Sequence, residues 1–309
     1  MTTLLLSHPA CLDHLTPMGH PERPDRLRAI ERALEHEKFQ SLAREQAPMA
    51  DLETAALAHP IDYIEQVREA SPREGMVRLD GDTTMSPGSF EAALRAVGGA
   101  VQAVDEVMEG KVTNAFVATR PPGHHAETAT PMGFCLFNNA AIAARHAQKK
   151  HGAERVAIVD FDVHHGNGSQ DIFWSDPTVM YCSTHQMPLY PGTGAVSERG
   201  ARNTIVNAPL RPGDGGDQFR QAMETTILPR LEDFGPDLVI ISAGFDAHIR
   251  DPLANLNFVE ADYTWVTQKL MELADRRANG RVVSLLEGGY DLEGLSKSVA
   301  AHVTALMWG

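Results

Sequence analysis

An acidic and histidine-containing motif directly follows an apolar, strand-like run in the middle of the chain. The run spans residues 155–159, and the motif Asp-Phe-Asp-Val-His occupies residues 160–164. Because side chains alternate along an extended strand, Asp160, Asp162 and His164 point to one side. The run before them is apolar enough to be a buried parallel strand. Two carboxylates and an imidazole are costly to bury unless a cation neutralises them, so the pattern predicts a divalent metal site of the zinc type.

Strand-like apolar runs alternate with helical stretches along the rest of the sequence. Strands are predicted at Thr3–Leu6, Val112–Thr119, Arg155–Phe161, Val179–Ser183, Asp237–Ser242 and Arg281–Leu286. Helices are predicted at Ser89–Glu109, Asn138–Lys150, Asp217–Leu231 and Glu260–Ala278. This alternation predicts an α/β fold in which helices cover both faces of a parallel sheet. Because no repeat or linker interrupts the chain, we expect residues 1–309 to form a single domain.

Charge and cysteine content narrow the classes of function. The formal net charge is −14 and no basic run is present, so we expect no nucleic acid partner. We also expect no membrane association, because no apolar run could span a bilayer and the amino-terminal segment lacks the basic start of a signal peptide. The three cysteines form no Cys-x-x-Cys pair, and their odd number favours a reducing cytoplasm. An acidic protein attracts cationic substrates at long range, although many soluble proteins are acidic without such a role.

Polar, titratable side chains follow four of the predicted strands. In an open parallel sheet, ligands bind at the carboxyl ends of the strands, so we expect these segments to meet at one edge. The segments are 120–125, 162–167, 243–248 and 287–290. Asp162, His164 and Asp246 are the candidate metal ligands, because three protein ligands leave the open fourth position that catalytic zinc requires. A buried salt-bridge cluster is the alternative, but no lysine or arginine adjoins either aspartate in sequence.

The paired histidines His124 and His125 are candidates for acid–base catalysis. The Pro-Pro-Gly segment before them stiffens the turn and allows a close backbone approach. An imidazole that titrates near neutral pH is the usual general base, and here Asp160 could orient one ring and Asn167 the other. Tyr290 follows two glycines, so its hydroxyl could donate to a developing oxyanion, with a tyrosine packed in the core as the alternative.

Four motifs together make the sequence similar to a known family. They are Arg-Pro-Pro-Gly-His-His, Gly-Phe-Cys, Asp-x-Asp-x-His-His-Gly-Asn-Gly and Ala-Gly-Phe-Asp, and the similarity runs from residue 19 to Tyr290. The chain resembles the zinc-dependent histone deacetylase and acetylpolyamine amidohydrolase superfamily, and Asn167 places it nearer the class II branch. The resemblance implies an arginase-like α/β fold with a central parallel sheet of eight strands. It also implies one Zn²⁺ per chain, held by Asp162, His164 and Asp246.

The same resemblance implies roles for the remaining candidate residues. His125 would be the main general base and acid, with His124 as its electrostatic partner paired to Asp160, and Tyr290 would polarise the acyl carbonyl. The remaining implied positions are substrate contacts: Gly133 offers its carbonyl to the substrate amide, Phe134 and Tyr190 line a tunnel for an extended acyl-lysine-like chain, and Asp82 holds the substrate backbone at the rim. From the residues alone, Phe134 and Tyr190 are either packing residues or walls of a narrow apolar channel. Many relatives carry phenylalanine where Tyr190 stands, so the preferred acyl group stays open.

The family also binds monovalent cations, typically K⁺, which implies one or two structural sites in this chain. The first would use side-chain or carbonyl oxygens of Asp160, Asp162, His164, Ser183 and Thr184. The second would lie around Phe173 and Val179.

These observations predict metal-assisted hydrolysis of an acylated lysine or a small acylated amine. An acetylpolyamine amidohydrolase is the nearest alternative, but the rim carries apolar Leu253 where a polyamine-selective relative would carry a glutamate. A non-catalytic acyl-lysine binding protein is an alternative from another class, although the catalytic candidates are all present. A binuclear manganese hydrolase of the arginase type would need further bridging carboxylates, which the sequence does not show. The sequence leaves a homo-oligomer open.

Overall fold

A parallel sheet of eight strands forms the centre of the computed structural model, which describes residues 2–308. The strands are β1 (Thr3–Ser7), β2 (Ala43–Gln46), β5 (Asn114–Val117), β6 (Val156–Asp160), β7 (Val179–Gln186), β8 (Ile205–Leu210), β9 (Leu238–Ala243) and β10 (Val282–Leu286). Their order across the sheet is β2-β1-β5-β10-β9-β6-β7-β8, and every neighbouring pair is parallel. Two short strands, β3 (Val77–Arg78) and β4 (Thr84–Met85), form a separate antiparallel pair.

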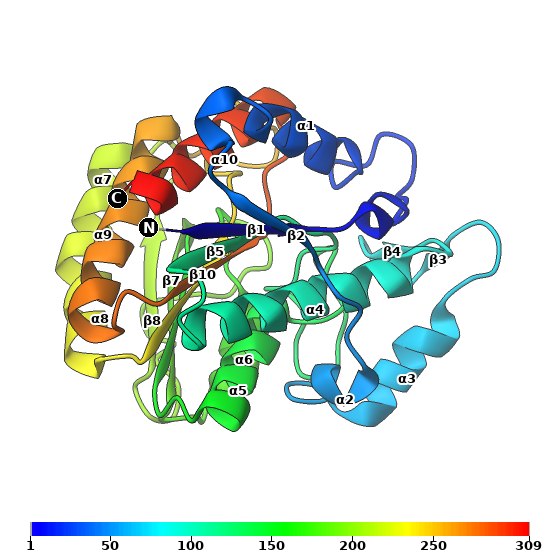
Figure 1. The fold of residues 1–309 in the computed structure, drawn as a ribbon, viewed down its shortest axis with the longest axis horizontal. Helices are drawn as coiled ribbons and strands as arrows, with labels where there is room; N and C mark the ends of the chain where they lie inside the picture. Colours follow the sequence, from blue (N-terminus) through cyan, green and yellow to red (C-terminus); the bar gives the residue numbers. More distant parts are fainter. Residues whose placement is uncertain (1, 309) are drawn as a thin grey trace.

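Helices cover both faces of the sheet (Figure 1). One face packs against α1 (Asp25–Leu34), α7 (Gly216–Ala222), α8 (Leu228–Phe234), α9 (Glu260–Arg277) and α10 (Leu292–Trp308). The other packs against α4 (Ser89–Met108), α5 (Asn139–His151) and α6 (Asn167–Phe173), and two short helices, α2 (Leu52–Ala55) and α3 (Ile61–Ala70), pack beside α4. Successive strand residues alternate between the faces: Leu5 joins the first core, and Leu4 and Leu6 join the second. Because both faces are buried, the strands are apolar along most of their length.

The predicted α/β fold with an eight-stranded parallel sheet is confirmed, with differences in detail. All six predicted strands occur, but β5 is shorter at both ends than the predicted Val112–Thr119. Strands β2 and β8, which form the two edges of the sheet, were not predicted. The predicted helix at Asp217–Leu231 is helical throughout, but its middle turn, Met223–Ile227, is π-helical and lies between α7 and α8.

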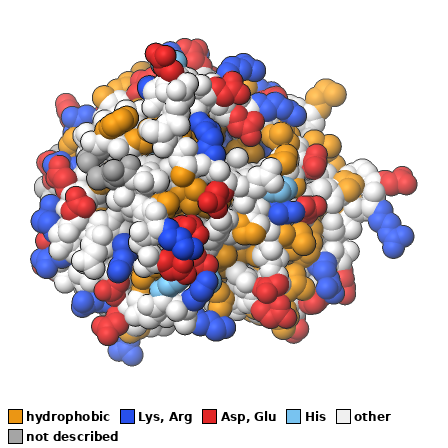
Figure 2. Space-filling view, in the orientation of Figure 1, with side chains coloured by type: hydrophobic (Ala, Val, Ile, Leu, Met, Phe, Trp, Pro, Cys, Tyr) orange, Lys and Arg blue, Asp and Glu red, His pale blue; other side chains and the backbone are white. Residues whose placement is uncertain are grey.

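Acidic and basic side chains are interspersed on the face of the molecule that Figure 2 draws. Within residues 2–308, no helix combines the length and apolarity needed to cross a bilayer.

The topology brings the four strands with polar carboxyl-terminal segments next to one another. These strands are β5, β10, β9 and β6, and they lie in this order at the centre of the sheet. Since the strands are parallel, the segments that follow them emerge at the same edge.

Candidate active site

Two of these segments bring together the predicted metal ligands. Asp162 and His164 follow β6, and Asp246 follows β9, which is the neighbouring strand. One ligand atom from each residue lies within 4.8 Å of the others, and all three residues are buried. The His164 Nδ1 atom is 3.2 Å from Asp162 Oδ1 and 3.0 Å from Asp246 Oδ2. A carboxylate, an imidazole and a second carboxylate therefore converge on one point.

The electrostatics of this point favour a cation. Although burial opposes the charged form, hydrogen bonds to Asp162 and Asp246 raise the pKa of His164 to about 10. Burial and the negative charge of Asp162 raise the pKa of Asp246. The two carboxylates thus hold a proton on His164 as their counter-charge, and a divalent ion would take its place, because a metal-bound imidazole must be deprotonated. The donor set of two oxygens and one nitrogen fits zinc.

Two glycines leave room for the carboxylates. A Cβ atom on Gly244 would collide with Asp162 Oδ2, and one on Gly288 would collide with Asp246 Oδ2. The Gly288 N–H also donates to Asp162 Oδ2 at 2.8 Å, and the Val163 N–H donates to Asp246 Oδ1 at 2.9 Å. The backbone therefore orients both carboxylates at close range.

The paired histidines lie beside this point, and each has a different partner. His124 Nδ1 is 2.8 Å from Asp160 Oδ2, whereas His125 Nδ1 is 2.8 Å from Asn167 Oδ1. The amide orientation of Asn167 follows from its NH₂ group, which donates to Glu127 Oε1 at 2.8 Å. His125 therefore donates from Nδ1 and leaves Nε2 free to accept a proton.

The two partners separate the protonation states of the pair. Burial lowers the pKa of both imidazoles, but the carboxylates of Asp160 and Asp162 reverse this effect at His124 and raise its pKa well above the usual value. Burial and the adjacent charge of His124 lower the pKa of His125 well below the usual value. One ring is thus cationic and the other neutral, although their centroids are only 4.0 Å apart.

Tyr290 completes the set at the end of β10. Its ring stands edge-on to Phe134, with centroids 5.9 Å apart, and the Arg26 guanidinium carbon lies 5.0 Å from its ring centroid. Burial raises the pKa of the phenol well above 10, so the hydroxyl keeps its hydrogen at neutral pH. The Tyr290 N–H donates to Asp251 Oδ2 at 2.8 Å, which holds the residue at its turn.

A cavity of about 230 Å³ leads to these groups from the surface. Its lining includes every predicted substrate contact together with three of the catalytic and metal candidates: Asp82, Gly133, Phe134, Tyr190 and Leu253, with His125, His164 and Tyr290. Leu189 also lines the cavity and was not predicted. A narrow hollow therefore ends where a metal candidate, a base candidate and a hydroxyl donor meet.

One wall of the cavity depends on two consecutive residues with left-handed backbone. Gly133 has φ +57° and Phe134 has φ +70°. A Cβ atom on Gly133 would collide with the His125 ring, so this close approach requires glycine. The Gly133 N–H donates to Asp82 Oδ1 at 3.0 Å, and the Phe134 N–H donates to Thr83 Oγ1 at 3.1 Å. The loop that carries Asp82 therefore holds this wall in place.

The residues predicted for the first monovalent cation site lie together. Strand β7 pairs with β6 so that Ser183 lies opposite Asp160, and Asp162 and His164 follow directly. Thr184 is buried, and its hydroxyl has no hydrogen-bond partner within residues 2–308. Phe173, at the end of α6, and Val179, at the start of β7, are both buried in the core on the α6 face.

A buried ionic network supports the site, and sequence reasoning assigned it no role. The Glu22 carboxylate bonds the guanidinium groups of Arg26 and Arg120, and all three side chains are fully buried. Arg26 also donates to the carbonyl oxygens of Gly289 and Glu287 at 2.6 and 2.5 Å. These bonds fix the backbone on both sides of Gly288. Glu22 and Arg26 are four residues apart, but Arg120 and the two carbonyl groups are distant in sequence, so no local pattern indicates the network as a whole.

Two further carboxylates hold the backbone of the catalytic segments. Glu287 Oε2 accepts from the N–H groups of Gly123 and His124 at 2.7 and 3.1 Å, and burial raises the pKa of Glu287 to about 7. Asp251 accepts from the Tyr290 N–H, and burial followed by the nearby Asp246 raises its pKa to about 7. Glu287 lies within the predicted polar segment 287–290 and Asp251 lies near the predicted rim residue Leu253, and that position in the sequence is their only signal.

A family model described as "Histone deacetylase domain" matches residues 20–306. The chain belongs to the histone deacetylase family. It is 40% identical over 324 residues to histone deacetylase 14, chloroplastic, of Arabidopsis thaliana, covering 98% of this chain and 76% of that protein. It is 39% identical over 277 residues to the histone deacetylase-like amidohydrolase of Pseudomonas aeruginosa, covering 88% and 73%. The crystal structure of the HDA15 HD domain superposes with a TM-score of 0.94 at 37% identity, over 99% of this chain and 88% of that chain.

Membership in the histone deacetylase family, together with the fold, makes this chain a metal-dependent deacetylase or amidohydrolase that acts on amide bonds of acylated amines. The family is generally zinc-dependent, and the group Asp162, His164 and Asp246 fits such an ion. Two of the relatives are named as chloroplastic. The cytoplasmic location predicted from the cysteines therefore stays a prediction.

Proposed function

We propose that this protein removes acetyl or other acyl groups from acylated lysine side chains or similar small amines, using one zinc ion held by Asp162, His164 and Asp246. The observation that carries the proposal is the cavity of about 230 Å³, which ends at His125, His164 and Tyr290. A narrow cavity of this kind admits an extended chain and excludes a bulky one. Within residues 2–308, the site holds one group of three metal-ligating side chains, which supports a mononuclear centre over a binuclear one.

The bound zinc ion would polarise the acyl oxygen and lower the pKa of a water molecule. The protein's own groups supply the proton transfers. His125 is neutral and presents Nε2, so it accepts the proton of the attacking water. His124 stays cationic through Asp160 and stabilises the negative charge that develops nearby. His125, once protonated, returns the proton to the leaving amine.

Tyr290 and the cavity wall would position the acyl group. The protonated Tyr290 hydroxyl donates to the oxygen on which negative charge develops. The Gly133 carbonyl accepts from the substrate amide, in place of its present contact with Cys135 Sγ at 3.3 Å. Phe134 and Tyr190 enclose the aliphatic part of the substrate, and Asp82 lies in the lining where it meets the substrate backbone. Apolar Leu253 favours an acyl-lysine chain over a polyamine, because it offers no counter-charge to a second ammonium group.

We also propose that K⁺ binds at the Asp160, Asp162, His164, Ser183 and Thr184 group, which is supported by the pairing of β6 with β7 that places Ser183 opposite Asp160. A second K⁺ site near Phe173 and Val179 remains a proposal from the family resemblance. One catalytic domain over residues 1–309 is the simplest organisation, and it is supported by the match of the family model to residues 20–306.

The proposal is tested by turnover of a matched panel of acetyl-lysine peptides, acetylpolyamines and short acylamides, with metal analysis of the same sample. We expect near-stoichiometric zinc, and equimolar release of acetate and amine from acetyl-lysine. Asp246→Ala should lose the metal, and His125→Ala should keep it but lose turnover. Unchanged metal content in Asp246→Ala, or parental turnover in His125→Ala, would contradict the assignment.

A further inference from the structure

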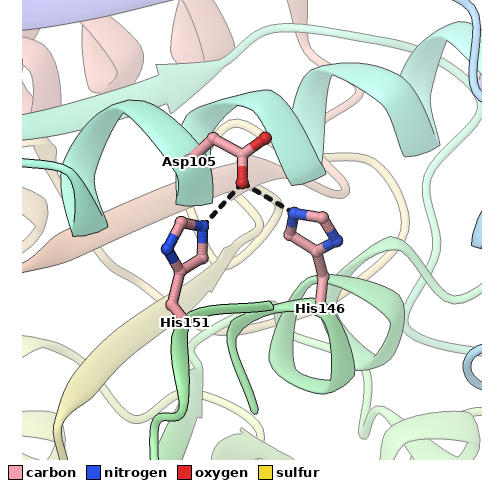
Figure 3. A group of neighbouring side chains, drawn as sticks. All are labelled: Asp105, His146 and His151. Atoms are coloured by element: carbon pink, nitrogen blue, oxygen red, sulfur yellow. Dashed lines mark hydrogen bonds and ion pairs between the residues drawn. The ribbon is translucent and has the colours of Figure 1, made fainter. Parts of the chain in front are cut away.

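A second group of metal-ligating side chains lies between helices α4 and α5. Asp105 projects from α4, and His146 and His151 project from α5, so the three side chains meet across the helix interface (Figure 3). The Nε2 atoms of His146 and His151 are each 2.7 Å from the same oxygen, Asp105 Oδ1. His151 is the last residue of α5, before Gly152 at φ +68°. The helix therefore ends where its final side chain can turn toward Asp105.

This cluster is separate from the candidate active site. His151 precedes β6, which begins at Val156, whereas the predicted zinc ligands follow the end of that strand at Asp160. The cluster therefore lies at the amino-terminal ends of the strands, opposite the carboxyl ends that carry the candidate active site. It is also partly accessible, since the side chains of Asp105, His146 and His151 are 22%, 16% and 12% exposed. A solvent ion can reach it without passing through the catalytic cavity.

We propose that Asp105, His146 and His151 form a second metal site, which binds a first-row divalent transition ion such as Zn²⁺ and links α4 to α5. Two imidazoles and one carboxylate suit zinc and its neighbours in the first row, and they exclude Ca²⁺ and Mg²⁺, which take oxygen ligands. The three ligand atoms already lie within 4.8 Å of one another. Ligand atoms around tetrahedral zinc are about 3.3 Å apart. Small side-chain rotations would lengthen the present 2.7 Å contacts between Asp105 and the two histidines to that separation.

Lys150 affects this site in two opposing ways. Its Nζ atom is 2.7 Å from Asp105 Oδ2, so it bonds the carboxylate oxygen that the histidines do not contact. The contact holds the carboxylate in place, which is the usual role of an outer partner of a metal ligand. The positive charge of Lys150 also repels a bound cation. Replacement of Lys150 should therefore change the affinity for Zn²⁺ if the cluster is a metal site, and should not if it is only an ion-pair cluster.

The test is a titration of the purified full chain, already holding its catalytic metal, with Zn²⁺ in competition with a chromophoric chelator. We expect one further equivalent, bound more weakly than the first. His146→Gln and His151→Gln should each weaken this second equivalent by about tenfold or more, as removal of a metal ligand does. His36→Gln, at an exposed histidine outside the cluster, is the matched control and should bind like the parent. Lys150→Met should strengthen the second equivalent by about fivefold, because it removes a partly screened positive charge.

Deacetylase turnover is measured in parallel, and His146→Gln and His151→Gln should retain the parental rate because the cluster lies away from the catalytic edge. Turnover also shows that the variants are folded. Lys150→Met tests the second-site affinity independently, because both histidines remain intact. Absence of a second equivalent in the parent would overturn the proposal. Equal second-site affinity in the parent and in the His146→Gln/His151→Gln double variant would overturn it as well.

Discussion

Replacing Tyr290 by phenylalanine removes one hydroxyl and leaves the packing of the ring intact. The ring contacts with Phe134 and with the Arg26 guanidinium involve the aromatic face and edge, which phenylalanine also provides. The backbone bond from the Tyr290 N–H to Asp251 is unaffected. We therefore expect Tyr290→Phe to unfold at the parental temperature and to bind its metal fully, so that any loss of rate comes from the missing oxyanion donor.

One oxyanion donor contributes about 2.7–4 kcal/mol to the transition state, which corresponds to a loss of about 10²–10³ in kcat. Because the hydroxyl bonds the oxygen most strongly in the transition state, kcat and kcat/KM should fall together. The assay is acetate release from an acetyl-lysine peptide, measured over a range of substrate concentrations together with metal content and thermal unfolding.

Tyr181→Phe is the matched control. The Tyr181 hydroxyl donates to Asp160 Oδ2 and accepts from the Gly166 N–H, both at 2.9 Å. Its removal leaves buried partners unpaired, so we expect a stability loss of about 1–3 kcal/mol. Tyr290→Phe should differ from it by a large loss of rate with no loss of stability. Parental turnover in Tyr290→Phe, or a loss of rate that only parallels a fall in stability, would refute the reasoning.

Three further variants test other parts of the structure. Gly288→Ala places a methyl group against the Asp246 and Asp162 carboxylates, so we expect loss of bound metal by elemental analysis, and full occupancy would contradict this. Glu22→Gln disturbs a buried ionic network and should cost about 3–5 kcal/mol in urea unfolding. Burial opposes ionisation of Glu22, but Arg120 and His14 outweigh it and hold the folded-state pKa well below the usual 4.5. The stabilising effect of the Glu22 carboxylate is therefore present above pH 4.5 and lost as the pH falls further, and Glu22→Gln should flatten that acid dependence. Leu253→Glu should shift kcat/KM toward acetylpolyamines by about tenfold, or about 1.4 kcal/mol; a parent that already prefers acetylpolyamines at low and high salt would refute the proposed selectivity.

The sheet centre and the gathering of the site residues were predictable because each depends on local sequence. Each central strand is a short apolar run, and each is followed directly by its polar residues, so the parallel topology alone brings Asp162, His164, Asp246 and Tyr290 to one edge. The pairing of one histidine with Asp160 and the other with Asn167 was also predictable, and the structure pairs His124 with Asp160 and His125 with Asn167. The roles of these residues stay predictions until the variants above are measured.

The edge strands could not be predicted from their own composition. Strand β2 reads Ala-Arg-Glu-Gln, and three of its residues are exposed, so it is a strand only because it pairs with β1. Strand β8 contains Asn207 and Pro209, which weaken a strand pattern but are tolerated at the edge of a sheet. The buried network of Glu22, Arg26 and Arg120 was not predicted for a different reason: Glu22 meets Arg120, and Arg26 meets the backbone after β10, only in the folded chain.

The bonds from Arg26 to the carbonyl oxygens of Glu287 and Gly289 have a consequence for biosynthesis. The bonded residues are 261 and 263 positions apart in the chain. At about 5–20 residues per second, a ribosome takes roughly 13–53 s to add the later partners after it has added Arg26. During that interval the Arg26 guanidinium, which is buried in the finished protein, lacks the carbonyl oxygens of Glu287 and Gly289 as hydrogen-bond acceptors. A nascent chain that has not yet reached β10 lacks Tyr290 and the turn that carries it, so under the proposed mechanism we expect it to be inactive.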